Sequence, residues 1–118
     1  SVNMQTPELS VEHMRFALQL IKVARDRGLF NVNMYERVGA FRDKLRVAVE
    51  AVETHHKCVR DEFTCDMARE MLSIVVIASS TKSGFELDEY ISVGVFARVL
   101  NLHMVPPPPV GVEETKSQ

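Results

Sequence analysis

The chain has 118 residues, of which 46% are hydrophobic and 25% are charged, as expected for one globular domain. Its formal net charge of −2 gives no electrostatic reason to expect nucleic acid or an anionic membrane as a partner. The longest predominantly apolar run covers residues 71–78, with Ser73 inside it, whereas a membrane-spanning helix needs about 20 residues. Two cysteines are too few for a disulfide framework, and no signal peptide is visible, so we expect a reducing, intracellular setting.

Two helices are predicted in the first half of the chain. Ser10 is a typical N-cap, and the apolar periodicity after it predicts a helix over about residues 11–27. Gly28 can end this helix because glycine adopts a positive φ without strain. Asn31 or Asn33 can cap the next helix, which is expected to continue to about residue 56. Its buried stripe is predicted to consist of Val38, Phe41, Leu45, Ala48, Val49 and Val52.

Two further helices are predicted in the second half. Thr64 has the character of an N-cap, and apolar residues at helical spacing follow it over residues 67–78. The β-branched run at 74–78 leaves a strand as the alternative for that segment. Asp88 is expected to cap the fourth helix. The polar stretch over residues 55–63 is predicted to be a turn, although a helix could continue into it.

The two halves share a pattern of aromatic, valine and glycine residues, which predicts an internal duplication. Five residues of the first half recur 55 positions later. They are Phe30, Tyr35, Val38, Gly39 and Phe41, which match Phe85, Tyr90, Val93, Gly94 and Phe96. Each half would form a helical hairpin, over about 10–57 and 64–103, with an apolar face that it cannot bury alone. We therefore expect an all-α bundle of four helices with approximate two-fold symmetry over residues 1–104.

Gly39 and Gly94 occupy equivalent positions inside the second and fourth predicted helices. Glycine in the middle of a helix is unfavourable by about 1 kcal/mol relative to alanine. A shared packing reason would explain both glycines, and we expect the second and fourth helices to approach each other closely there.

Residues 105–118 are predicted to form an extended tail. The four consecutive prolines cannot continue a helix and favour polyproline II. This segment is either a stiff spacer or a ligand for an apolar groove on a partner. The candidate interaction residues are Val105, Pro106, Pro107, Pro108, Pro109 and Val110.

The candidate metal ligands of soft character lie within eleven residues and are His55, His56, Cys58 and Cys65. Nitrogen and sulfur ligands of this kind suit zinc, but the paired CxxC and HxxxH spacings of zinc sites are absent. Carboxylates would have to complete such a site, and the candidates are Asp61, Glu62 and Asp66. The sequence favours the alternative of a solvated helix end, where His side chains interact with the helix dipole. We therefore expect no metal and no cofactor, with zinc as the lesser alternative.

Enzymatic motifs are missing from the sequence. It contains no phosphate-binding glycine loop and no dinucleotide fingerprint, and it lacks the two Glu-x-x-His motifs that a carboxylate-bridged metal site takes from two different helices. A cysteine nucleophile at Cys58 would need a positioned base and an oxyanion-binding loop, and only the base has candidates, in His55 and His56. The sequence thus predicts a non-enzymatic protein that acts through protein–protein contacts, without a small-molecule substrate.

Five short segments carry a resemblance to a known kind of protein: Glu8-Leu-Ser-Val-Glu12, Ala17-Leu-Gln19, Arg27-Gly-Leu-Phe30, Val38-Gly-Ala40 and Asp43-Lys-Leu45. This pattern, over about residues 8–46, resembles helical-hairpin small proteins encoded by large DNA viruses of algae and marine hosts. A degenerate copy covers about 62–100. The resemblance implies no activity. It implies a minor structural, capsid-associated protein of the virion, whose partners are coat proteins or further copies of itself. The alternative is a soluble helical adaptor or regulator.

Overall fold

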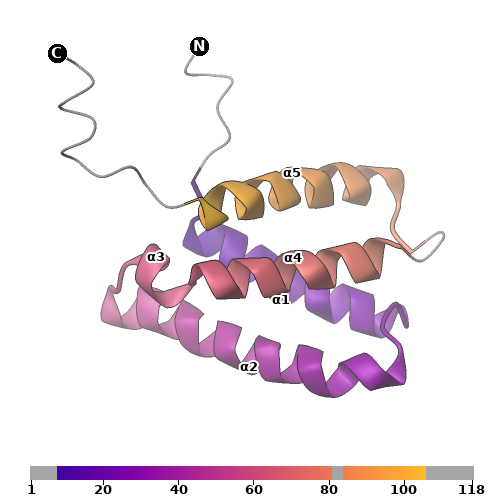
Figure 1. Ribbon diagram of the computed structural model, residues 1–118, viewed down its shortest axis with the longest axis horizontal. Helices are drawn as coiled ribbons and strands as arrows, with labels where there is room; N and C mark the ends of the chain where they lie inside the picture. Colours follow the sequence, from indigo (N-terminus) through magenta and orange to yellow (C-terminus); the bar gives the residue numbers. More distant parts are fainter. Residues whose placement is uncertain (1–7, 81–83, 106–118) are drawn as a thin grey trace, which may run out of the picture.

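The computed structural model describes residues 8–80 and 84–105, and over these residues all regular structure is helical (Figure 1). The elements in chain order are α1 (Val11–Asp26), α2 (Val32–His55), α3 (Val59–Glu62), α4 (Cys65–Ser79) and α5 (Leu87–Met104). The predicted all-α class is confirmed. The strand alternative for residues 74–78 is wrong, because this segment continues α4 and its period of 3.6 residues buries Ile74, Val75 and Ala78 on one side.

Local sequence signals set most of the helix ends. Ser10 directly precedes α1, and its backbone N–H donates to Nδ1 of His13 at 2.9 Å. Gly28 has a φ of +71° just after the end of α1, the left-handed conformation that glycine tolerates. Thr64 caps α4 because its hydroxyl oxygen accepts the backbone N–H of Met67 at 3.2 Å.

The prediction that Asp88 caps the last helix is wrong. Helix α5 begins at Leu87, and Glu86 is its N-cap. The reason is a reciprocal capping arrangement, in which the backbone N–H of Glu86 donates to the carboxylate of Glu89 at 2.7 Å.

The turn predicted at residues 55–63 contains a short helix. Helix α2 ends where His56 adopts the left-handed conformation, with a φ of 56°. The single turn of α3 follows, and the fully buried side chain of Phe63 ends it. Burial of this aromatic ring explains why the polar stretch is folded back against the bundle.

The helices form two hairpins, α1 with α2 and α4 with α5, that share one hydrophobic core. Side chains of α2 meet α4 through the ion pair between Arg37 and Glu70, and α1 meets α5 through the ring of Phe16 against that of Phe96. In Figure 1, α2 and α5 therefore lie at opposite edges of the bundle. The largest fully buried side chains come from both hairpins and from the segment between them: Met14, Phe41, Leu45, Phe63, Met71, Ile74, Val99 and Leu100.

The close helix approach expected at Gly39 and Gly94 is absent. A Cβ atom added at either glycine would meet no heavy atom of the described residues within 4 Å, apart from nearby backbone of its own helix. The physical reason is the arrangement of the bundle, which places α2 and α5 at opposite edges rather than next to each other. Packing among the described residues explains neither glycine.

Helix α5 continues to Met104, and Val105 is the last described residue before the proline run. The predicted interaction residues 106–110 lie outside the described residues. Within the described ranges, the helices are too short or too polar to cross a bilayer.

We expect Phe41→Ala to lower the free energy of unfolding by about 3–5 kcal/mol, because it removes a fully buried ring and leaves a cavity. Val47→Ala on the same helix should change it by less than about 0.5 kcal/mol, since Val47 is exposed. Urea denaturation of both variants measures this difference, and equal effects would contradict the described core.

Candidate interaction surface on α5

Helix α5 has one face in the core. Its buried side chains follow a helical period and pack against α4 and α1: Val93, Phe96, Val99, Leu100 and His103. His103 is the single buried polar residue of this set, and its ring lies in hydrogen-bonding contact with the backbone carbonyl of Phe63. Burial lowers the pKa of His103, although this hydrogen bond acts in the opposite direction.

The opposite face of α5 is also apolar. Leu87, Ile91, Val95 and Leu102 have exposed fractions of 75%, 61%, 40% and 47%, and their spacing of four, four and seven residues aligns them along one side. We call these four residues the outer stripe. A helix that is apolar all round is normally buried on all sides. Each such side chain gains about 1.5–3 kcal/mol when it is fully removed from water, so the outer stripe is a surface that a contact would stabilise.

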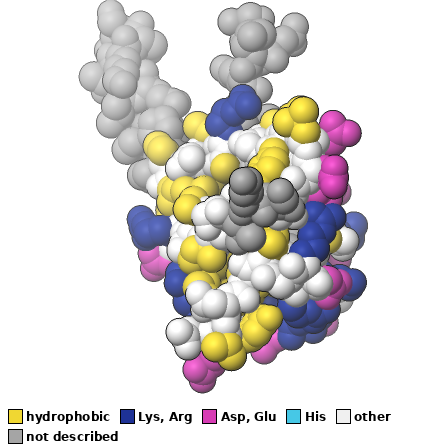
Figure 2. All heavy atoms as spheres, turned by 90° about the vertical axis from the view of Figure 1, so that its right-hand side faces the viewer, with side chains coloured by type: hydrophobic (Ala, Val, Ile, Leu, Met, Phe, Trp, Pro, Cys, Tyr) yellow, Lys and Arg dark blue, Asp and Glu magenta, His cyan; other side chains and the backbone are white. Residues whose placement is uncertain are grey.

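Other exposed apolar residues are distributed differently. Val47 on α2 and Val76 on α4 are exposed as single residues, which is normal for a protein surface. Figure 2 looks at the end of the bundle where α5 begins, and apolar side chains reach the surface there between charged ones. In the described part of the chain, α5 alone presents four exposed apolar residues in line.

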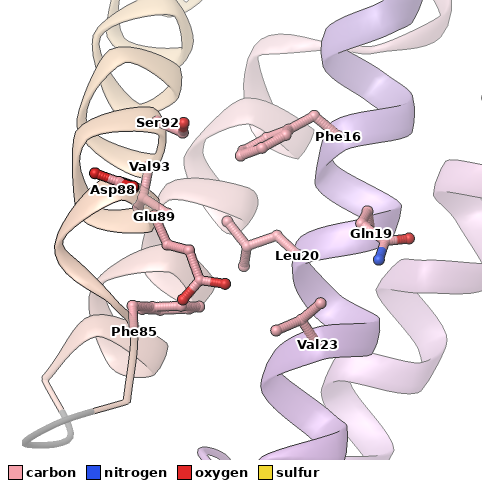
Figure 3. Close-up of a pocket in the computed structure, with 9 residues that line it drawn as sticks. All are labelled: Phe16, Gln19, Leu20, Val23, Phe85, Asp88, Glu89, Ser92 and Val93. Carbon is pink, nitrogen blue, oxygen red and sulfur yellow. The ribbon is translucent and has the colours of Figure 1, made fainter.

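A groove of about 330 Å³ lies beside this helix, between α5 and α1 (Figure 3). Its floor is apolar and consists of Phe16, Leu20, Val23, Phe85 and Val93. Gln19, Asp88, Glu89 and Ser92 supply its polar rim. The groove is large enough for one or two side chains. It adjoins the outer stripe, because Asp88 on its rim is the next residue after Leu87.

An ion pair holds the start of α5 against the end of α1. The guanidinium of Arg27 donates to both carboxylate oxygens of Glu89, at 2.7 and 2.8 Å, and to the carbonyl of Gly84 at 3.0 Å. It also lies 5.8 Å from the centre of the Phe85 ring. These bonds from Arg27, together with the backbone N–H of Glu86, lower the pKa of Glu89 to about 2.

A second arginine holds the other end of α5. The guanidinium of Arg60 donates to the carbonyls of His103 at 3.1 Å and Val105 at 3.3 Å. The thiol of Cys65 donates to the carbonyls of His103 and Met104, at 3.7 and 3.6 Å. The carbonyls of His103 and Met104 lie in the last turn of α5, where no intrahelical donor remains for them, and Val105 is the C-cap of the helix. Sequence reasoning missed the roles of Arg60 and Arg27, because each contact joins residues distant in the sequence.

The predicted metal candidates do not assemble. His55, His56 and Cys58 are exposed at the end of α2, whereas Cys65 is half-buried and directed toward the end of α5. Within residues 8–80 and 84–105, the structure brings no three His, Cys, Asp or Glu residues together in a way that could hold a metal ion. The lesser alternative of zinc therefore gains no ligand set from the described residues.

Comparison of the chain with protein-family models, curated protein sequences and solved structures found no match.

The Arg27–Glu89 pair predicts acid sensitivity. Because the folded state lowers the pKa of Glu89 from 4.5 to about 2, the unfolded chain binds more protons between these values. The stability contributed by Glu89 is therefore complete above about pH 4.5 and is lost as the pH falls toward 2. We expect Glu89→Gln to unfold at a lower temperature than wild type at neutral pH, with a smaller further loss in acid.

Asp43→Asn provides the control, since Asp43 is an exposed carboxylate on α2 whose ion-pair partner is Arg42 and not Arg27. It should keep the wild-type dependence of melting temperature on pH. Calorimetry between pH 7 and 2 distinguishes the variants, and identical pH profiles for Glu89→Gln and wild type would rule out this role of the pair.

Proposed function

We propose that this chain is a non-enzymatic protein that acts through protein–protein contacts, with the outer stripe of α5 as its interaction surface. The observation that carries the proposal is the alignment of four exposed apolar side chains on a helix whose other face is already in the core. Arg27 holds the start of this helix and Arg60 holds its end, so the surface lies on a helix that is anchored at both ends. A rigid apolar face loses little conformational freedom on binding.

The proposal includes an origin of the scaffold by duplication of one helical hairpin, with approximate two-fold symmetry. In support, the repeated residues have like environments: Phe30 and Phe85, Val38 and Val93, and Phe41 and Phe96 are all buried. At the same spacing of 55, the outer stripe corresponds to Val32, Glu36, Ala40 and Val47 on α2. The charged Glu36 replaces one of these residues on α2, whereas all four residues of the outer stripe on α5 are apolar, so the second copy carries the proposed surface.

The most specific form of the proposal is a minor, capsid-associated structural protein of a large DNA virus. It is supported by the resemblance of residues 8–46 to helical-hairpin proteins of such viruses. Coat proteins or further copies of the chain would then be the partners, inside the host cell and in the virion. Residues 105–110 would add a second contact, since the exposed Val105 lies three residues after Leu102, the last residue of the outer stripe.

A helical adaptor or regulator is the second candidate. It is favoured by the groove between α1 and α5, which is large enough to receive an apolar side chain from a partner segment. The two candidates differ in whether the partner belongs to an assembled particle.

A photo-crosslinking amino acid at Ile91 tests the proposal in native source material, with the same group at Glu36 as the matched control on α2. We expect covalent adducts from position 91, with mass spectrometry identifying copies of the chain or coat proteins, and few adducts from position 36. Adducts with proteins outside particles would favour the adaptor. Equal adduct yields from both positions would contradict the assignment of the surface to α5.

A further inference from the structure

We infer that α5 of one copy packs antiparallel against α5 of a second copy, about a two-fold axis that passes between Gly94 and Val95. This inference rests on the proposed function, in which the outer stripe is an interaction surface, and it identifies the partner as the chain itself. The residues that would line the contact are the four of the outer stripe together with Gly94 and Arg98, all of which are exposed.

The spacing of these residues is self-complementary. Leu87 and Leu102 are equally distant from the midpoint between Gly94 and Val95, and so are Ile91 and Arg98. In a two-fold contact, residue i meets residue j while j meets i. Leu87 would therefore pack on Leu102 of the second copy at both ends of a contact roughly 22 Å long, at 1.5 Å per residue. Ile91 would cover the aliphatic stem of the second copy's Arg98.

Charge favours the antiparallel direction. The start of α5 carries the exposed carboxylates of Glu86 and Asp88. The second half carries the exposed Arg98, and Arg60 is fixed at the end of the helix by its bonds to two carbonyls. An antiparallel pair places the acidic start of each helix beside the basic half of the other, and opposes the two helix dipoles. A parallel pair would bring Arg98 against Arg98.

Gly94 gives an independent reason for a contact at the centre of this face. It is exposed in the middle of α5, where alanine would favour the helix more, and no described side chain approaches the position of its missing Cβ. Packing within residues 8–80 and 84–105 thus provides no reason for glycine. In the inferred pair, Gly94 lies next to the two-fold axis, where the absence of a side chain lets two helix backbones approach closely. The equivalent Gly39 on α2 is flanked by Glu36 and Asp43 instead of an apolar stripe.

Sedimentation equilibrium of the full chain tests the association. We expect a reversible monomer–dimer equilibrium for wild type, at least a tenfold weaker dimer for Ile91→Glu, and no change for Val47→Glu, an exposed valine outside the outer stripe. Circular dichroism checks that all three proteins remain equally helical. A wild type that stays monomeric, or equal effects of the two substitutions, would overturn the inference.

Disulfide trapping tests the direction and register, in a Cys58→Ser background that removes the exposed thiol. We expect Val95→Cys to form a disulfide-linked dimer on mild oxidation, and Leu87→Cys alone to form none. A mixture of Leu87→Cys and Leu102→Cys should form the mixed dimer. A linked dimer of Leu87→Cys alone would show parallel packing and overturn the inference. If wild type is monomeric while position 91 still forms adducts with another protein, the proposed function stands and only self-association fails.

Discussion

Helix α5 packs against the rest of the bundle on one side only, and the proposed function depends on this constraint. The helix is apolar on both sides, but a bundle of this size covers only the side that faces α4 and α1. Its inner face contributes Phe96, Val99 and Leu100 to the core, which fixes the orientation of the helix and thereby directs the outer stripe away from the bundle. The orientation of α5 that buries its inner face in the core therefore also exposes the outer stripe.

The ends of α5 are held by contacts that connect distant parts of the chain. Arg27 reaches Glu89 across 62 residues of sequence, and Arg60 reaches the carbonyls at the end of the helix across more than 40 residues. Arg60 donates to carbonyl groups at the end of α5 that lack intrahelical partners. Arg27 forms a charge-assisted pair with the carboxylate of Glu89 at the start of the helix. The two contacts hold both ends of α5 on the bundle, while the residues of the outer stripe between them are exposed.

Periodicity and caps predicted the helices well, because Ser10, Thr64 and Gly28 act within a few residues of their own helix ends. The start of α5 was predicted wrongly because Glu86 competes with Asp88 as a cap and gains its advantage from a bond with Glu89. The prediction that two helices approach closely at Gly39 and Gly94 was wrong for a different reason, since it depended on which helices are neighbours in the bundle. Periodicity identifies the apolar residues of α5, but only the assembled bundle shows which of them stay exposed.

Methyl NMR across a dilution series tests the central claim most directly, because it reports on individual side chains of the native, unsubstituted chain. We expect concentration-dependent shifts for the methyl groups of Leu87, Ile91, Val95 and Leu102, with Val47 and Val76 unchanged. Shifts that are absent from the outer stripe, or that occur equally at Val47 and Val76, would contradict the assignment of this face of α5 as the contact between copies.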